Sequence, residues 1–248
     1  MALGQRIREP DWKIALKAIA FTLFGTNPLY CRGAIRNAQL AKTIYPGWTA
    51  IFWVERAVPE SVAGEIQAAG AQVRPYSART IPNGMFARFL VNDEPGIKRY
   101  LVRDVDSRLT EREREAVAQW ERSGKLFHVM RDHPYHGMPI MGGTWGCVGG
   151  VIPDMNRVMR RFPKFRRRYT REWGYGIDQE FLMQEIWPVV KSSALAHDSC
   201  TRDKFPDSAP FPTGMKLGDW RFVGEVFDEN DQPDPHHWQM RVNRMEAP

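Results

Sequence analysis

Residues 99–108 read RYLVRDVDSR, and the interpretation of the whole chain starts from this stretch. Its first part, 99–105, is apolar enough for a buried strand, and Asp104 and Asp106 stand at its end. Alternate residues of a strand point the same way, so both carboxylates can face one point at the carboxyl edge of a sheet. Ligands bind at that edge in open α/β sheets. Two hard oxygen ligands there suit Mg²⁺ or Mn²⁺, which can bridge the phosphates of a nucleoside diphosphate.

Strand-like and helix-like segments alternate on both sides of this stretch, which predicts an α/β fold with a mostly parallel, Rossmann-like sheet flanked by helices. The predicted strands are 13–24, 48–55, 72–76, 99–105, 126–130 and 194–197, with a further short strand in the Gly-rich segment 139–150. The predicted helices are 33–44, 59–70, 110–124, 154–169 (interrupted by Pro163) and 178–187. From Cys200 onward, frequent Pro, Asp and Gly predict an irregular tail lying over the domain.

The composition excludes several classes of protein. A chain of 248 residues with 43% hydrophobic and 26% charged residues is typical of a soluble globular protein. Cys31, Cys147 and Cys200 contain no CxxC pair, so neither a disulfide framework nor a zinc ribbon is indicated. The first residues lack the apolar core of a signal peptide, and the apolar run 18–24 is too short to span a bilayer, so we expect a cytoplasmic protein. No GxxxxGK[ST] loop is present, which excludes the P-loop class.

The net charge of +6 comes from one segment. Arg157–Arg171 holds eight basic residues and no acid, and the rest of the chain carries 27 basic and 29 acidic residues. Three interpretations stay open. The segment can be a solvated helix, or a membrane-surface contact in which Phe162, Phe165 and Trp173 interleave with the charges, or a surface that neutralises the phosphates of a nucleic acid.

Six blocks of the sequence together resemble a family of small GT-A glycosyltransferases, and the resemblance extends over about 18–230. The blocks are LFGTNPLYCRGAIRNAQLAKTIYPGW (23–48), RYLVRDVDSR (99–108), FHVMRDHPYHGMPIMGGTWG (127–146), YGIDQEFL (175–182), HDS (197–199) and FVGEVFDEN (222–230). The resemblance implies a single GT-A domain over 1–248, in which about 13–130 bind the nucleotide sugar and 131–248 form the acceptor side and the tail. It implies transfer of a sugar, a hexose from a UDP-sugar, to an acceptor hydroxyl with Mn²⁺ or Mg²⁺ as cofactor.

The resemblance also implies roles for individual residues toward the nucleotide and the metal. Asp104 and Asp106 should bind the metal, with His197 as a third ligand. The base and ribose should lie against Phe24, Thr26 and Asn27. Arg202 and Lys204 should meet the diphosphate as it leaves.

A second group of residues is expected around the sugar. Gly142 and Gly143 should let the backbone approach the sugar closely, and Trp145 should offer it a flat face. Asp178 is the first choice and Glu180 the second for the carboxylate beside the transferred sugar. That carboxylate would deprotonate the acceptor hydroxyl in an inverting enzyme and contact the sugar or stabilise positive charge in a retaining one. Arg103 and Gln179, next to these motifs, are counted with the residues that bind the sugar donor.

Alternatives remain for the metal, the acceptor and the class of protein. His133, His136, Cys147 and His197 could form a zinc site, although the HxxH spacing straddles Pro134, and polar groups framing the sugar pocket are the preferred interpretation. The acceptor is either an envelope glycan or lipid-linked saccharide, or a hydroxymethylated base in DNA, flipped out of the stack and held through Arg157–Arg171. A non-catalytic nucleic-acid-binding protein and a nucleotidyltransferase are the alternatives of other classes.

Overall fold

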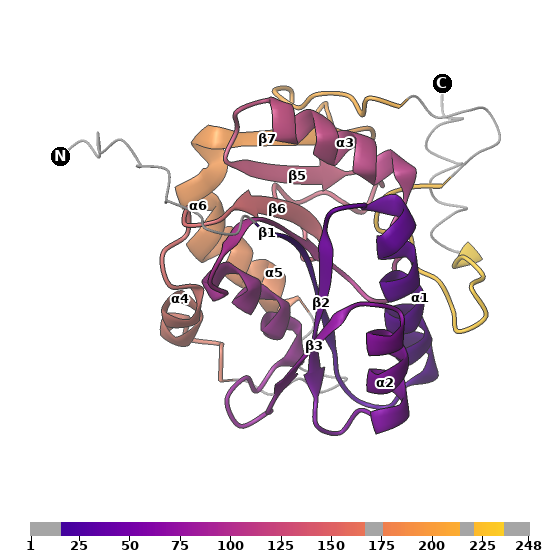
Figure 1. Ribbon diagram of the computed structural model, residues 1–248. Helices are drawn as coiled ribbons and strands as arrows, with labels where there is room; N and C mark the ends of the chain where they lie inside the picture. The colour runs from indigo at the N-terminus through magenta and orange to yellow at the C-terminus, as the bar shows by residue number, and fades with distance from the viewer. Residues whose placement is uncertain (1–15, 167–175, 214–220, 236–248) are drawn as a thin grey trace.

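A sheet of seven strands in the order β3-β2-β1-β4-β6-β5-β7 forms the centre of the computed structural model, which describes residues 16–166, 176–213 and 221–235 (Figure 1). The strands are β1 Leu16–Leu23, β2 Thr49–Glu55, β3 Gln72–Tyr76, β4 Ile97–Arg103, β5 Phe127–Arg131, β6 Thr144–Val148 and β7 Ala194–Asp198. Each strand predicted from the sequence is present, and the α/β fold is confirmed. Residues 13–15 of the first predicted strand lie outside the described ranges.

Most neighbouring strands are parallel, as predicted. β1 pairs in parallel with β2 and β4, β2 with β3, and β5 with β7. β6 is the exception and runs antiparallel between β4 and β5. The connection from β5 to β6, residues 132–143, contains no helix, and adjacent strands joined without a crossover helix run antiparallel. The carboxyl ends of β1 to β4 therefore meet at one edge of the sheet.

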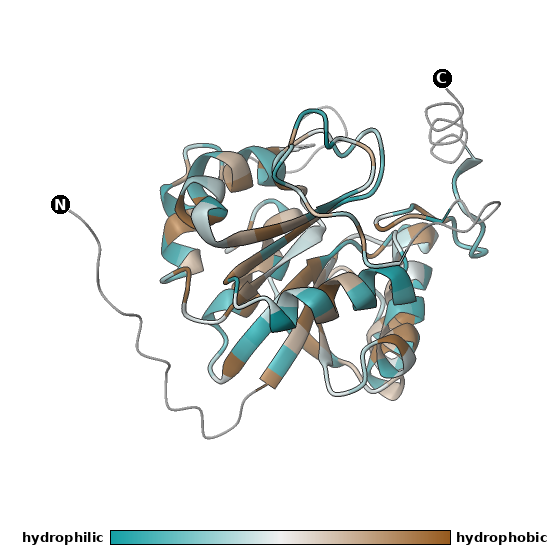
Figure 2. Cartoon of the chain, turned by 90° about the horizontal axis from the view of Figure 1, so that it is seen from above, coloured by the Kyte–Doolittle hydropathy of each residue, from teal (hydrophilic) through white to brown (hydrophobic). Residues whose placement is uncertain are grey.

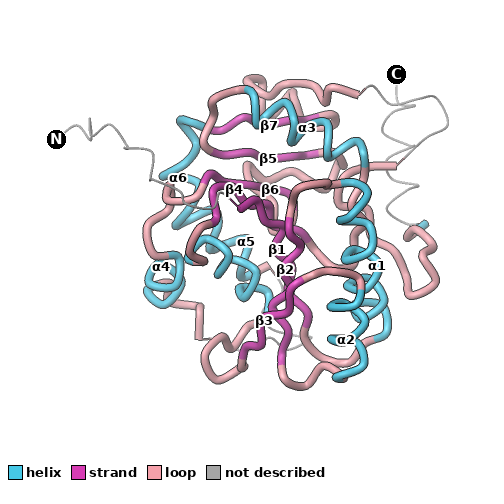
Figure 3. Tube along the Cα trace, viewed as in Figure 1, coloured by secondary structure: helices cyan, strands magenta, loops and turns pink. Residues whose placement is uncertain are grey.

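Helices cover both faces of the sheet, because strands of a parallel sheet are apolar on both sides. One face packs against α1, α2 and α3 through Phe21, Phe52 and Trp120, and the other against η1, α4 and α5 through Phe86, Phe89 and Trp145 (Figures 1 and 3). Seen from above, many of the strand residues are hydrophobic (Figure 2). The helical elements are α1 Pro28–Ile44, α2 Glu60–Ala68, the 3₁₀ helix η1 Gly84–Asp93, α3 Glu111–Arg122, α4 Met155–Arg161, α5 Ile177–Phe181, the π turn η2 Leu182–Ile186, α6 Trp187–Val190 and the 3₁₀ turn η3 Lys191–Ser193.

Three helices differ from the sequence prediction. α1 begins at Pro28 and not at Gly33. Asn27 caps the helix, because its Oδ1 accepts a hydrogen bond from the Leu29 N–H (3.0 Å), and proline suits the first helical position. The predicted helix 154–169 is shorter: α4 ends before Phe162, which is extended as residues preceding proline prefer, and 167–169 lie outside the described ranges. The third, η1, was not predicted.

The described part of the tail contains no named helix or strand over 199–213 and 221–234, as expected. It lies on the domain through isolated bridges, in which Ser107 pairs with Val226 and His197 with Ala209. Among the described residues, no helix combines the length and the apolar character needed to cross a membrane.

Candidate active site

A cavity of about 260 Å³ opens at the carboxyl ends of β1 and β4. Residues from five separate parts of the chain line it: the end of β1, η1, the loop after β4, the segment around 136–144 and the segment 176–179. Tyr30 of α1 and the tail residues Gly224 and Val226 complete the lining. Its polar side chains are Thr22, Arg88, Asp104, Asp106, His136, Thr144, Asp178 and Gln179. The edge of the sheet predicted to bind a ligand therefore carries a cavity.

The loop after β4 is held by the buried side chain of Asn37 on α1. Its amide donates to the carbonyl groups of Val105 (3.3 Å) and Ser107 (2.7 Å), and its carbonyl accepts the Leu109 N–H (3.1 Å). Gly33 allows this approach, because a Cβ there would lie 2.0 Å from the Val105 carbonyl oxygen. This loop carries Asp104 and Asp106, and both line the cavity.

Arg88 on η1 is a residue of the cavity that the sequence analysis missed. Its guanidinium is buried and forks between two carboxylates, donating from Nη1 to Asp104 Oδ1 and from Nη2 to Asp178 Oδ2 (2.8 Å). It joins two segments that are 74 residues apart in the chain. The sequence indicates this role only by placing an arginine inside the apolar run MFARFLV (85–91). An arginine buried with such a run requires an anionic partner.

The cavity holds more negative than positive charge, because Arg88 faces three carboxylates. Burial, and then the charge of Asp104, raises the pKa of Asp106 to about 7. Burial also raises the pKa of Asp178, although the charge of Arg88 opposes that shift. Asp104 and Asp106 supply the hard oxygen ligands that Mg²⁺ and Mn²⁺ prefer, and a divalent cation would offset the excess negative charge. The residues present thus fit such an ion.

Gly142 and Gly143 form a wall against the carboxylates. A Cβ on Gly143 would lie 1.8 Å from Asp104 Oδ2, and one on Gly142 would lie 3.0 Å from Asp178 Oδ2. Trp145 does not present a face to the cavity, contrary to expectation. It is fully buried, stacks on Phe127 (centroids 5.2 Å apart) and donates from Nε1 to the Gly142 carbonyl (3.2 Å). Trp145 therefore supports the glycine wall from behind.

Gly143→Ala is expected to displace the Asp104 carboxylate, because a Cβ has no room at 1.8 Å. We expect a loss of roughly 1–3 kcal/mol in the free energy of unfolding, the usual cost of overpacking. The control is Gly64→Ala in α2, where a Cβ meets nothing within 4 Å and alanine favours the helix. Urea unfolding of both variants checks the prediction, and equal stability of the two would contradict it.

The residues expected at the nucleotide divide into two groups. Phe24 lines the cavity and also a second cavity of about 430 Å³ at the carboxyl ends of β2 and β3. Thr26 and Asn27 are exposed and line neither, and Asn27 instead caps α1. Further lining of the second cavity comes from Glu55, Arg56, Tyr76, Arg79, Ile81 and Pro82.

Of the two acidic candidates after Gly176, only Asp178 lines the cavity. Glu180 bonds Lys164 Nζ through both carboxylate oxygens (2.6 and 2.7 Å), outside the cavity lining. The two residues are two apart on a helix, so they cannot share a face. Gln179 lines the cavity and its amide contacts Met141 Sδ (3.8 Å).

Arg103 lies outside the cavity, contrary to expectation. It is the last residue of β4, and alternation along the strand turns its side chain to the face opposite Asp104. There it is buried and pairs with Glu113 on α3 (3.1 Å), which also accepts the Tyr45 hydroxyl (2.8 Å). Arg103 thus stabilises the packing of α3.

His197 and the two basic tail residues also lie elsewhere. His197 is on β7, with β6 and β5 between it and β4, and its Nδ1 faces His128 Nε2 (2.8 Å) while Nε2 meets Gln119 Oε1 (3.0 Å). The expectation that His197 joins Asp104 and Asp106 is therefore wrong. Arg202 is exposed, and Lys204 donates to the Gly137 carbonyl (2.6 Å); neither lines the cavity.

The four side chains of the zinc alternative are not brought together. Cys147 is buried in β6 and donates to the Val148 carbonyl (3.3 Å), and His197 bonds His128 and Gln119. His136 lines the cavity and accepts the Asp132 N–H at Nδ1 (3.0 Å). Within 16–166, 176–213 and 221–235, no group of three or more His, Cys, Asp or Glu side chains is placed to bind a metal.

The buried His128–His197 pair should make the fold acid-sensitive. Burial lowers the pKa of His197 from 6.5 to about 4 and also lowers the pKa of His128 well below its ordinary value. Below pH 6.5 the unfolded chain binds protons that the folded chain excludes, so stability present above pH 6.5 is lost as pH falls toward 4. We expect His197→Gln to flatten this dependence, measured as urea unfolding across that range; parallel profiles for the two proteins would contradict the assignment.

Comparison with known proteins found no matching family model and no matching curated protein. Among solved structures, a glycosyltransferase involved in the glycosylation of the major capsid of PBCV-1 is 12% identical, with 81% of this chain and 94% of that chain covered and a TM-score of 0.45. Glucosyl-3-phosphoglycerate synthase from Mycobacterium tuberculosis in complex with Mn²⁺, UDP-glucose and glycerol 3-phosphate is 11% identical, with 77% and 76% covered and a TM-score of 0.45. Mannosyl-3-phosphoglycerate synthase from Rubrobacter xylanophilus is 13% identical, with 78% and 70% covered and a TM-score of 0.46. These values are too low to assign a function to the chain.

Proposed function

We propose that the chain is a metal-dependent glycosyltransferase that transfers a hexose from a UDP-sugar to an acceptor hydroxyl. The observation that carries the proposal is the convergence of Asp104, Asp106, Asp178 and Arg88 in one cavity at the carboxyl edge of the sheet. The sequence resemblance to GT-A glycosyltransferases supports the same reaction and is the source of the uridine and hexose assignments.

Asp104 and Asp106 would hold the cation. Two carboxylates are enough when phosphate oxygens and water complete the coordination, as is usual for Mg²⁺ at nucleotide sites. The cation supplies Lewis-acid stabilisation of the diphosphate leaving group. Asn37 and Gly33 keep the loop that carries the two carboxylates in place before any ligand binds.

Buried polar atoms without hydrogen-bond partners support the proposal that the ligand extends across both cavities. Thr22 and Arg88 line the first cavity and Tyr76 lines the second, and Thr22 Oγ1, Arg88 Nε and the Tyr76 hydroxyl have no hydrogen-bond partner among the described residues. Leaving a buried polar group unpaired costs about 1–3 kcal/mol, which a bound ligand can offset. We assign the base and ribose to the second cavity, with Phe24 between the two, and the diphosphate and sugar to the first.

Asp178 is the carboxylate beside the transferred sugar in this proposal. Its raised pKa brings it closer to the working range of a general base. In an inverting reaction it takes the proton of the acceptor hydroxyl, and in a retaining one it stabilises positive charge on the sugar. Arg88 holds the carboxylate in place through Oδ2 and links it to Asp104.

The acceptor is proposed to be a glycan hydroxyl, and the hydroxymethylated base of DNA is the alternative. The test incubates the pure protein with Mn²⁺ and a panel of UDP-, GDP-, ADP- and CMP-sugars, alone and with hydroxymethylated DNA, and follows release of free nucleotide. Slow metal-dependent release from a UDP-hexose is the expected result, and acceleration by the DNA would identify the acceptor.

A second incubation, with nucleoside triphosphates in place of nucleotide sugars, distinguishes a glycosyltransferase from a nucleotidyltransferase. Release of pyrophosphate from a nucleoside triphosphate, with every nucleotide sugar left intact, would overturn the glycosyltransferase assignment. Absence of both turnover and nucleotide-induced thermal shift would overturn the assignment of the cavity to a nucleotide.

A further inference from the structure

Four arginines on the outer side of α4 and of the turn after it form an exposed basic surface. They are Arg157, Arg160, Arg161 and Arg166, named here the α4 arginines. Arg160 bonds Asn156 Oδ1 (2.7 Å), and none of the four forms an ion pair with any residue in the described ranges. Four exposed guanidinium groups within ten residues leave a local excess of positive charge.

Two neighbouring carboxylates, those of Asp93 and Asp154, offset part of this charge, but within the described residues neither forms an ion pair with an α4 arginine. Asp93 and Asp154 accept backbone N–H groups of the first turn of α4, from Met155 (2.7 Å) and Arg157 (2.9 Å) respectively. Glu180 is paired with Lys164. The α4 arginines are therefore open to an external anion.

The apolar residues of the same segment face the core. Met155, Met159, Phe162 and Phe165 are all buried, and Phe162 packs against Phe181 with ring centroids 5.5 Å apart. A membrane-surface segment needs apolar side chains that can enter the lipid boundary. The described part of this segment, up to residue 166, exposes no large hydrophobic residue. Phe162 and Phe165 therefore cannot enter a membrane surface, as the membrane interpretation requires. Trp173 and Arg167–Arg171 lie outside the described residues.

The basic surface adjoins the cavity, because the same elements build both. η1 carries Arg88 in the cavity and Phe86 under this segment, with Phe86 and Phe165 centroids 5.4 Å apart. Gln179 lines the cavity, and the next residue, Glu180, bonds Lys164 between the α4 arginines. A long anion on this surface would pass beside the cavity.

We propose that the α4 arginines bind the phosphodiester backbone of a nucleic acid strand beside the cavity. Guanidinium groups pair with phosphate oxygens through two parallel hydrogen bonds, and a row of them suits a repeating phosphate chain. This binding requires no sugar donor, so it goes beyond the proposed transfer reaction.

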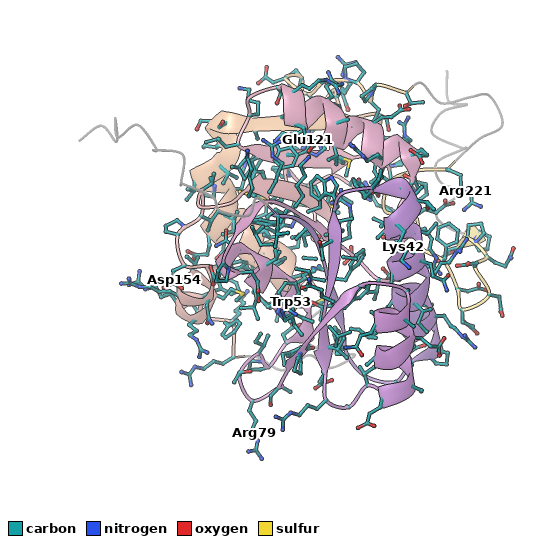
Figure 4. The ribbon with its side chains drawn as sticks, in the orientation of Figure 1. Lys42, Trp53, Arg79, Glu121, Asp154 and Arg221 are labelled. Carbon is teal, nitrogen blue, oxygen red and sulfur yellow. The ribbon has the colours of Figure 1, made fainter. Side chains whose placement is uncertain are left out.

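The test measures fluorescence anisotropy of labelled single-stranded DNA of about 20 nucleotides, without sugar donor, between about 50 and 200 mM salt. The variant replaces all four α4 arginines by glutamine. The control replaces Arg32, Lys42, Arg122 and Lys125 by glutamine, which removes the same charge from exposed positions on the α1 and α3 side. Lys42 and Asp154 at the start of α4 mark these opposite sides in Figure 4.

The expected result is binding by the wild type and the control, with affinity at least tenfold weaker in the α4 variant, on the order of 1.4 kcal/mol. The slope of log affinity against log salt should become shallower by up to about 3, since each lost phosphate contact contributes about 0.7. Equal weakening in both variants would overturn the proposal, because net charge alone would explain it. Binding to anionic phospholipid vesicles with none to DNA would overturn it in favour of a membrane. Transfer activity is not scored, so failure here leaves the proposed reaction untouched.

Discussion

Asp106→Asn is expected to lower metal-dependent turnover of the sugar donor by roughly 1,000-fold or more, because the loss of a cation ligand removes several kcal/mol of transition-state stabilisation. The same change should stabilise the protein in the absence of metal. A partly exposed carboxylate next to Asp104 becomes a neutral amide, and the pKa of Asp106, raised from 3.8 to about 7, indicates how unfavourable the charge is.

The pH dependence of the free energy of unfolding provides a second test of Asp106→Asn. A raised pKa in the folded state means that Asp106 weakens the fold of the metal-free protein as pH rises through 7 and does not weaken it below 3.8. The gain from Asp106→Asn, on the order of 1–3 kcal/mol at neutral pH, should therefore vanish toward pH 4. Urea unfolding with a chelator present measures it.

Glu180→Gln is the matched control for Asp106→Asn, since it neutralises a carboxylate that lies outside the cavity and is paired with Lys164. We expect turnover close to that of the wild type and an unchanged thermal shift with Mn²⁺. Asp178→Asn should lose turnover while keeping that shift, because Asp178 is not assigned to the cation. A large loss of turnover in Glu180→Gln would contradict the choice of Asp178.

Arg88→Met is expected to destabilise the protein by about 3–5 kcal/mol, the usual cost of removing one partner of a buried ion pair. The side chains of Arg88 and Asp178 are 7% and 6% exposed, so water cannot replace the guanidinium. The double variant Arg88→Met/Asp178→Asn should recover part of the loss, because the uncompensated buried charge is gone.

Arg74→Met is the control for Arg88→Met. Arg74 faces Glu94 at 3.8 Å with its side chain 40% exposed, and exposed pairs contribute less than about 1 kcal/mol. Urea unfolding of the three variants and the wild type measures the differences. If Arg88→Met lowers the free energy of unfolding no more than Arg74→Met does, the bridge that Arg88 forms between Asp104 and Asp178 has no structural role.

Much of the fold could be predicted because its signals are local. Most strands of the sheet are short apolar runs, such as TAIFWVE of β2, and the predicted bounds lie within a few residues of the observed ones. The predicted helix 110–124 is α3, and the Thr110 hydroxyl caps it by accepting the Glu113 N–H (3.2 Å). η1 was not predicted, because its hydrophobic residues follow no periodicity strong enough to distinguish a helix from a loop.

Part of the candidate site was predictable from the ends of strands, and part only from the family resemblance. Asp104, Asp106 and Phe24 directly follow β4 and β1, and parallel strands bring their carboxyl ends to one edge. Gly142 and Gly143 were predicted from that resemblance, and their closest neighbours are the carboxylates Asp178 and Asp104.

By itself the sequence determined the class of fold, the edge of the sheet that carries the cavity and the two carboxylates at the end of β4, because alternation and strand ends are properties of neighbouring residues. Only the tertiary structure decided which distant side chains join them. It brought in Arg88 from η1 and set His197 on a strand that is not adjacent to β4. It also turned Arg103 to the opposite face of the sheet and buried Trp145 behind the glycine wall. These outcomes depend on strand order and on which face each helix covers, and both are set by contacts between residues far apart in the chain.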